Sequence, residues 1–523
     1  MFKRILALLA AGMAALLLSA CDNTTQGGAA ATTAAAPAGP VFRILAGSEL
    51  KDIAPLVTDF GNRNGVTVQL DYTGSLDAVD RLSDTHNYDA VWVSHGKYLQ
   101  LVPGVKSQIK AAEKTMYSRV VLGVREPVAK RLGWQSGKTT WEDVIKAAQA
   151  GKFRFAMTNP TASNTGFVAL VGLAAELSGK GDALEVKDIP EDRLKALFAS
   201  QSMTSGSSGT LADQFVAQPD AADGLINYES VIRTLNARAG QNLTVIVPKE
   251  GVITADYPLM LLTGSKQGDF YQKLVDYLRT PQTQKTIAET TFRTPLEGGA
   301  TDDVVNELPF PGSQAVVDAI LKGFGDVYSK PASSFFVIDV SGSMAGERLN
   351  AVQASMGRLV NGDGSLAGRF ATFRAREELR VTPFNHQVLG SRSFALTSDV
   401  QANKAVLAQL SAFVNGLRAD GGTAIYDALA TTYRDAQQRA KGGERTVSIV
   451  LLTDGENQDG MSREEFTNFI ASAGSPRVPI YPIAYGEADL DDLGAIAKAT
   501  GGTLFDARTV QLSRVLKGIR AYQ

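Results

Sequence analysis

The chain has 523 residues, of which 44% are hydrophobic and 20% are charged, a composition that suits several folded domains rather than one core. Its formal net charge is −2, so no electrostatic argument favours nucleic acid as a partner. The single cysteine, Cys21, excludes a disulfide within the chain.

The first 20 residues have the layout of a secretory signal. Lys3 and Arg4 precede an apolar run over residues 5–18, and small residues follow it. This order is typical of a cleaved signal peptide rather than of a spanning helix. The sequence Leu18-Ser19-Ala20-Cys21 also resembles the lipobox of bacterial lipoproteins, which implies cleavage before Cys21 and acylation of its thiol. The alternative is a plain signal peptide with an incidental cysteine.

The segment after Cys21 predicts a tether. Residues 21–40 are mostly Ala, Thr, Gly and Pro, which cannot build a core. Asp22 resembles the signal that retains Gram-negative lipoproteins in the inner membrane. No later stretch is long and apolar enough to span a bilayer. We therefore expect a lipid-anchored protein that faces the periplasm or the extracellular side.

Residues 41–300 alternate between strand and helix patterns, which predicts an α/β domain with a largely parallel sheet. Thr140, with Asp143 three residues later, predicts a helix N-terminus with a capping box. The predicted strands are residues 41–46, 66–72, 88–93, 153–157, 225–230, 243–248 and 257–262. The predicted helices include residues 49–61, 76–82, 167–177 and 269–278.

This order resembles the periplasmic substrate-binding proteins of ABC importers, in the group that includes molybdate, sulfate and phosphate receptors. The resemblance covers residues 41–295. It includes a serine turn after the first strand, a hydroxyl-rich turn after the second, a Thr/Ser-rich loop over residues 158–166 and Asn-Tyr-Glu-Ser at residues 227–230. It implies two lobes joined by hinge strands, with a ligand in the cleft between them.

Four hydroxyl side chains lie at or just before predicted helix starts, where free N–H groups attract anions. They are Ser48, Thr73, Ser75 and Thr165, and Tyr228 is a further candidate for the cleft wall. Ser207 and Ser208 form a weaker set. The structural alternative is that the hydroxyls are ordinary N-caps and turn residues, and that Tyr228 fills a core. The predicted ligand is a small oxyanion.

Residues 301–332 predict a connector with one helix over 313–324, and a second alternation fills residues 333–523. Pro383 argues for an edge strand or an early strand end. The predicted helices of this part are residues 348–360, 400–413, 425–440, 463–472, 490–500 and 509–518. The predicted strands are residues 335–339, 379–384, 447–454, 478–485 and 502–505.

The most informative stretch is residues 335–344. Four apolar residues read as a buried strand, and Asp339, Ser341 and Ser343 follow at alternate positions. All three offer oxygen donors, which Mg²⁺ prefers in a near-octahedral shell. Two later positions supply more oxygens, a hydroxyl at Thr423 and a carboxylate at Asp454 after a second buried strand. The carboxyl ends of parallel strands form a ligand-binding crevice, so these side chains are expected to meet.

This pattern resembles the von Willebrand factor A domain with its metal-ion-dependent adhesion site. The family pattern of Asp-x-Ser-x-Ser, a distant Thr and a distant Asp falls on all five positions. The family implies a doubly wound, Rossmann-like fold and a bound Mg²⁺ or Mn²⁺. It implies direct metal contact by the two serines and often Thr423, and contact through water by the two aspartates. The family also implies that an acidic side chain of a partner protein fills the open coordination position. The structural alternative is a capped strand-to-helix turn.

The sequence lacks the motifs that would indicate an enzyme. The three histidines have no zinc-binding spacing, and the chain has neither a phosphate-binding P-loop nor a Gly-x-Ser-x-Gly elbow. We therefore expect a non-enzymatic sensor or scaffold on the membrane. One alternative is the solute receptor of an ABC importer with an accessory A domain. Another is a chaperone-like subunit that serves a separate metal-dependent ATPase.

Overall fold

The structure is a computed structural model, and it describes residues 39–84, 87–297 and 306–523. The predicted signal peptide, Cys21 and the tether up to residue 38 lie outside the described residues. Within the ranges that are described, no helix combines the length and the apolar character needed to cross a membrane.

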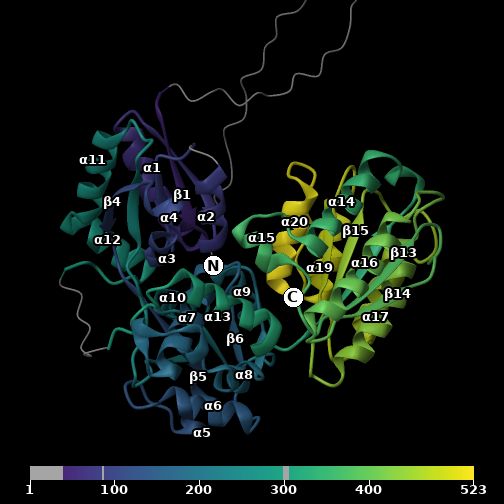
Figure 1. The fold of residues 1–523 in the computed structure, drawn as a ribbon, viewed down its shortest axis with the longest axis horizontal. Coiled ribbons are helices and arrows are strands. Elements are labelled where there is room, and N and C mark those ends of the chain that lie inside the picture. The colour runs from purple at the N-terminus through teal and green to yellow at the C-terminus, as the bar shows by residue number, and fades with distance from the viewer. Residues whose placement is uncertain (1–38, 85–86, 298–305) are drawn as a thin grey trace, which may run out of the picture. The chain divides into compact units, whose positions relative to one another are not determined.

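The N-terminal module has two lobes, each built on its own sheet (Figure 1). In the first lobe the sheet order is β2-β1-β3-β11-β4, with β1 parallel to β2 and β3, and β11 antiparallel to β3 and β4. Its strands are β1 (Val41–Gly47), β2 (Thr67–Thr73), β3 (Ala90–Trp92), β4 (Ile109–Lys114) and β11 (Pro258–Leu262). Its helices are η1 (Ser48–Asp52), α1 (Ala54–Arg63), α2 (Ser75–Asp84), α3 (Lys97–Leu101), α4 (Pro103–Lys106), α11 (Gly268–Arg279) and α12 (Pro281–Thr291).

The helix predicted over residues 49–61 is two helices. A 3₁₀ turn, η1, ends at Asp52, and the α-helix α1 starts at Ala54. Pro55 explains the break, because proline has no N–H and fits an α-helix only in its first turn. The apolar spacing located the helix correctly, and the proline fixed where it begins.

The second lobe is built on the sheet β10-β5-β8-β6-β7, with β9 paired to β5. Its strands are β5 (Ser118–Arg125), β6 (Phe155–Met157), β7 (Gln201–Met203), β8 (Gly224–Tyr228), β9 (Leu243–Ile246) and β10 (Thr254–Ala255). Its helices are α5 (Glu126–Leu132), α6 (Trp141–Gln149), α7 (Asn164–Ser178), α8 (Glu191–Phe198), α9 (Ser208–Ala217) and α10 (Glu229–Arg238). The capping box predicted at Thr140 and Asp143 is confirmed, since each accepts a hydrogen bond from the other's backbone N–H.

Aromatic side chains anchor both lobes. Trp92 is fully buried in the first lobe, where its Nε1 donates to the Tyr257 carbonyl at 3.0 Å. Trp134 and Trp141 are buried in the second lobe. These three are the tryptophans of the whole chain.

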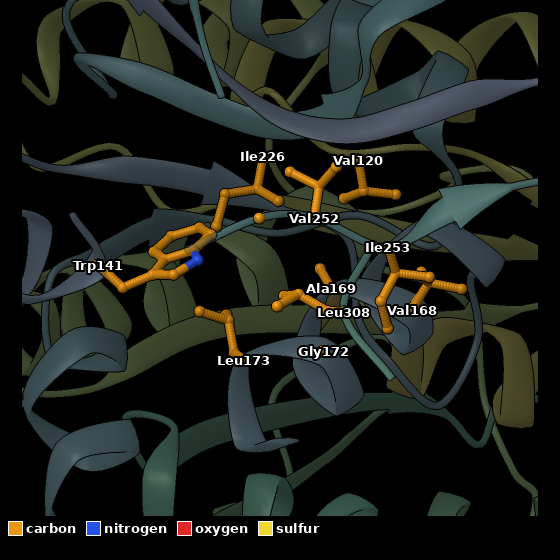
Figure 2. A pocket seen from close by; sticks show the side chains of 11 residues that line it. Val120, Trp141, Val168, Ala169, Gly172, Leu173, Ile226, Val252, Ile253 and Leu308 are labelled. Atoms are coloured by element: carbon orange, nitrogen blue, oxygen red, sulfur yellow. The ribbon is translucent and has the colours of Figure 1, made fainter. Parts of the chain in front are cut away.

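A small cavity lies beside α7 in the second lobe (Figure 2). Its walls are apolar and include Val120, Leu173, Ile253 and the ring of Trp141. Its volume is about 20 Å³, which is room for a single water molecule. The cavity is therefore too small to be a solute-binding site.

The helix of the predicted connector packs with the N-terminal module. This helix, α13 (Gln314–Gly323), places Val317 and Ile320 in the same hydrophobic core as the lobes. Phe310, just before it, lies against the rings of His95 and Phe167. The connector therefore contributes side chains to the first module's core.

His95 gives the N-terminal module a predicted acid sensitivity. Burial lowers the pKa of this histidine from 6.5 to about 4, and Lys97 and Lys114 add to the effect against the opposing charge of Asp256. Between pH 6.5 and 4, the unfolded chain therefore binds a proton at His95 that the folded chain does not bind. Protonation of His95 leaves the free energy of unfolding unchanged above pH 6.5 and lowers it as the pH drops towards 4. The expected loss is about 3 kcal/mol. Urea unfolding at a series of pH values measures it.

The control for this prediction is the exposed His386. His95→Gln should flatten the loss of stability between pH 6.5 and 4, whereas His386→Gln should retain it. Equal slopes for the wild type and His95→Gln would contradict the assignment.

The C-terminal module has one sheet between two helical layers. The sheet order is β14-β13-β12-β15-β16-β17, and all neighbours are parallel except β13 and β14. Its strands are β12 (Ala332–Asp339), β13 (Glu378–Phe384), β14 (Arg392–Ala395), β15 (Thr446–Thr453), β16 (Ile480–Ala484) and β17 (Phe505–Asp506). Its helices are α14 (Glu347–Asn361), α15 (Leu366–Ala371), α16 (Val400–Asn415), α17 (Ile425–Ala440), α18 (Arg463–Ser472), α19 (Leu490–Thr500) and α20 (Leu512–Ile519).

The central strand β12 is buried on both faces. Phe336 and Ile338 pack in a core with α14, α16 and α20, whereas Phe335 and Val337 pack in a core with α17, α18 and α19. Successive side chains of a strand point to opposite faces, so a strand between two helical layers must be apolar throughout. This explains the unbroken apolar run before Asp339.

The expectation that Pro383 marks an edge strand is wrong. Its strand, β13, lies between β12 and an antiparallel edge strand, β14, which the sequence analysis missed. The pairing with β14 covers only residues 378–381 of β13, so Pro383 lies beyond it. The strand ends one residue later, which agrees with the alternative expectation of an early end.

Candidate metal site and interlobe cleft

The candidate metal residues meet at the point where the strand order of the C-terminal sheet reverses. The chain runs from β12 to β13 on one side and later returns to β15 on the other. Asp339 is the last residue of β12, and Asp454 directly follows β15. Such a switch point leaves a crevice at the carboxyl ends of the two strands. The topology therefore explains why two carboxylates distant in sequence become neighbours.

Hydrogen bonds join four of the five predicted metal residues. The Ser341 and Ser343 Oγ atoms lie 3.1 Å apart, and Ser343 Oγ donates to Asp454 Oδ1 at 2.8 Å. Asp339 Oδ1 accepts from the Ser341 N–H at 2.8 Å. The Thr423 loop is held against the same turn, since the Gly342 N–H donates to the Gly421 carbonyl at 2.9 Å.

This oxygen set fits a hard divalent cation. In an octahedral Mg²⁺ shell with bonds of 2.0–2.1 Å, adjacent ligand oxygens lie about 2.9 Å apart. The distance of 3.1 Å between the Ser341 and Ser343 Oγ atoms is close to that spacing. No cluster of three or more His, Cys, Asp and Glu side chains with metal-binding geometry occurs among residues 39–84, 87–297 and 306–523. The candidate site consists of three hydroxyl residues and only two carboxylates, so it is not a cluster of that type.

The electrostatics of the crevice also favour a cation. Asp339 and Asp454 are both almost fully buried. Burial raises the pKa of Asp339, the charge of Asp454 raises it further, and hydrogen bonds from Thr453 and Ser341 work in the opposite direction. Ser343 is exposed, so the crevice opens to solvent on that side. A bound divalent cation would relieve the crowding of negative charge and remain accessible to a partner.

Sequence reasoning missed two residues of this site. Thr453 Oγ1 donates to Asp339 Oδ2 at 2.6 Å and so fixes the carboxylate. Arg348, near the start of α14, forms an ion pair with Asp454 and lies 3.9 Å from Glu487. Two signals in the sequence could have identified these residues. Thr453 is a hydroxyl residue directly before Asp454, and Arg348 is a basic residue shortly after the serine motif.

The cleft residues of the N-terminal module meet only in part. Ser75 Oγ donates to Asn164 Oδ1 at 2.5 Å, and Tyr228 OH donates to Ser94 Oγ at 2.7 Å. Thr165 is buried beside Asn164 at the start of α7. Thr73 instead donates to its neighbour Asp77 at 2.8 Å, and Ser48 is partly exposed at the start of η1.

Ser207, one of the weaker pair of serines, has a structural role. Ser207 accepts a hydrogen bond from the Thr210 N–H and is the N-cap of α9. This is the interpretation that the sequence analysis kept as an alternative for such positions.

Comparison with known families identifies both modules. The family model of the bacterial extracellular solute-binding proteins matches residues 42–293, and that of the von Willebrand factor type A domain matches residues 335–518. Residues 42–293 form a solute-binding domain, and residues 335–518 form an A domain. The predicted α/β fold, with a two-lobed domain before a Rossmann-like A domain, is confirmed.

The curated relatives match in part of their length. Inter-alpha-trypsin inhibitor heavy chain H3 of Mesocricetus auratus is 29% identical over 163 residues, which are 30% of this chain and 17% of that one. The Homo sapiens protein of the same name is 28% identical, over 30% of this chain and 16% of its own. The chain thus spans about a sixth of these relatives.

Among solved structures, similar chains include two binding proteins. The sulfate-binding protein SubI from Mycobacterium tuberculosis is 19% identical, with a TM-score of 0.40, and the match covers 52% of this chain and 93% of that one. The periplasmic binding protein AfuA from Actinobacillus pleuropneumoniae is 15% identical, with a TM-score of 0.43, over 55% and 98% of the two chains.

Arg348 is expected to weaken metal binding by the A domain. Its guanidinium occupies one oxygen of Asp454, and its charge opposes a second cation in the same crevice. A hydrogen bond between charged groups contributes about 1.5–3 kcal/mol, so Arg348→Gln should tighten Mn²⁺ binding about tenfold or more. Titration calorimetry of the metal-free protein measures the dissociation constant.

Arg380→Gln is the matched control, because Arg380 pairs with Asp435 in the same domain at 2.9 Å and away from the metal residues. It should leave Mn²⁺ binding as in the wild type. Unchanged or weaker binding by Arg348→Gln would show that the arginine does not compete for Asp454.

Proposed function

We propose that this protein is an extracytoplasmic binding protein that captures a partner protein through a divalent cation held by its A domain. The observation that carries the proposal is the pair of hydroxyls of Ser341 and Ser343, whose Oγ atoms lie 3.1 Å apart beside the buried carboxylates of Asp339 and Asp454. Solute-binding domains take small molecules and A domains interact with proteins, so both modules are of the binding type. Catalysis plays no part in this proposal.

The residues of the A domain have distinct roles. Ser341, Ser343 and Thr423 would hold Mg²⁺ or Mn²⁺, and Asp339 and Asp454 would act through bound water. The bound cation supplies a positive centre with an open coordination position. Thr453 holds the Asp339 carboxylate in place, and the exposed Ser343 lies on the side from which a partner can approach. The matching chemistry on the partner is an acidic side chain.

The location proposed for this protein is the outer side of a membrane. The match to extracellular solute-binding proteins supports an extracytoplasmic location. The lipobox-like sequence before Cys21 supports a lipid anchor, in the inner membrane if the cell is Gram-negative. Incorporation of a labelled fatty acid, and its loss in Cys21→Ser, would test the anchor.

Partner capture is the direct test of the function. The purified chain is immobilised and exposed to detergent-solubilised envelope proteins, first with Mg²⁺ and then with EDTA. We expect a defined protein to bind in Mg²⁺, to be released by EDTA, and to be missing from Ser341→Ala. Binding that survives both EDTA and Ser341→Ala would refute a metal-dependent mechanism.

A second candidate function is the solute receptor of an importer. The family match over residues 42–293 favours it. In that case a small anion would bind at the cleft, near Ser75, Thr165 and Tyr228, and the A domain would serve docking. Binding of a small anion by the wild-type cleft distinguishes this candidate from the first.

A further inference from the structure

The two lobes of the solute-binding domain touch where the resemblance to substrate-binding proteins places a cleft. Gly74, between β2 and α2, lies so close to the second lobe that a Cβ there would be 2.1 Å from the Ala162 carbonyl oxygen. Ser75 and Ser94 of the first lobe bond to Asn164 and Tyr228 of the second. Polar groups that would otherwise face a ligand are therefore bonded to each other.

The centre of this contact is a carboxylate that no prediction included. Glu49 lies in η1, at the turn where the first strand ends, and its side chain folds back over Gly47. A Cβ on Gly47 would lie 2.5 Å from Glu49 Oε1, so a larger residue at position 47 would displace the carboxylate from this place. The Glu49 side chain thus occupies the space beside the turn at Gly47.

Donors from both lobes converge on Glu49. Asn164 Nδ2, at the start of α7, donates to Oε1 at 3.2 Å and to Oε2 at 3.4 Å. Arg293 lies close by, with Nη2 bonded to the Glu49 carbonyl at 2.8 Å. Burial raises the pKa of Glu49, whereas its own N–H, Asn164, Arg293 and Ser94 all favour the charged form. These are the kinds of donors that a bound oxyanion would use.

We propose that the Glu49 carboxylate is the resident anion of the cleft and bonds the two lobes together in place of a free oxyanion. The domain then keeps the donors of an anion receptor but meets a solute anion with a like charge and a filled site. Glu49 acts as a tethered ligand, so its binding to these donors is intramolecular and has a high effective concentration. This inference does not depend on the metal site of the A domain.

Emptying the site is the test. Glu49→Ala removes the carboxylate and leaves the donors, so inorganic phosphate, sulfate or molybdate at millimolar concentration should raise the melting temperature of the domain by several degrees. The wild type should not respond to these anions. Glu49→Gln fills the same space without charge and should not respond either. If Glu49→Ala does not fold, Glu49→Ser replaces it.

Glu113→Ala is the control, since Glu113 pairs with Arg279 at 2.7 Å on the surface of the same lobe. Like the wild type, it should show no change in melting temperature with any of the three anions. Stabilisation of the wild type by an oxyanion would overturn the proposal. An unchanged melting temperature of both Glu49→Ala and Glu49→Ser with all three anions would also overturn it. Stabilisation of the wild type by a cation such as spermidine, lost in Glu49→Gln, would also overturn it, because Glu49 would then be a contact for a cationic solute.

Discussion

Replacing Asp339 with asparagine should remove at least half of the rise in melting temperature that Mg²⁺ gives to the A domain. The Asp339 carboxylate is fully buried and accepts hydrogen bonds from Thr453 Oγ1 and the Ser341 N–H. Asparagine keeps the shape but loses the charge, and it places an amide donor where one of these donors points. Loss of such a supporting group weakens metal binding about 10–100-fold.

The measurement is thermal unfolding in Mg²⁺ and in EDTA. A cation at a hundredfold its dissociation constant stabilises the wild type by about 2.7 kcal/mol, and a variant that binds about 10–100-fold more weakly should keep only about 0.4–1.4 kcal/mol of this. Without metal, the variant should be at least as stable as the wild type, because burial and Asp454 disfavour the charge on Asp339. The control is Asp435→Asn, at the surface ion pair with Arg380. An intact Mg²⁺ response in Asp339→Asn would exclude Asp339 from the site.

The largest effect on stability is expected at Glu377. This carboxylate is fully buried, and it forms a bidentate ion pair with Arg520 at 2.8 and 2.7 Å. Ser334 Oγ and the Arg374 N–H also donate to it. Burial acts to raise the pKa of Glu377, but Arg520 and the other donors hold it below its ordinary value. Glu377→Ala leaves Arg520 buried without its partner and should cost about 3–5 kcal/mol.

The next residue in the sequence provides the control. Glu378 is partly exposed and pairs with Arg439 at 2.7 Å and with Arg445 at 3.1 Å. Glu378→Ala should cost about 1 kcal/mol or less, because exposed ion pairs contribute little. Urea unfolding of both variants gives the comparison. Equal losses at the two positions would mean that burial does not set the contribution of these ion pairs.

Local patterns in the sequence predicted most of the A domain. The bounds of α17, α18 and α19 match the predicted helices, because each has a clear apolar stripe and a sharp start. The metal motif was recognisable for a similar reason, since Asp339, Ser341 and Ser343 lie within five residues. Asp454 could be placed beside them because the topology of a parallel sheet brings strand ends together.

Contacts between distant elements were beyond sequence reasoning. Arg348 is an ordinary helix residue until the fold places it against Asp454. The sequence around Glu49 is that of an ordinary helix start, and nothing in this segment predicts the approach of Asn164 from the other lobe. The edge strand β14 has only four residues and too little alternation to be recognised.

The distribution of tryptophan makes the two modules optically distinguishable. Trp92, Trp134 and Trp141 are all buried in the solute-binding domain, and residues 333–523 contain tyrosine but no tryptophan. Fluorescence excited selectively at the indole band therefore follows unfolding of the solute-binding domain alone, even in the full chain. Circular dichroism follows both domains, so the difference between the two signals isolates the A domain. One sample can thus report whether a change such as Glu377→Ala remains confined to its own domain.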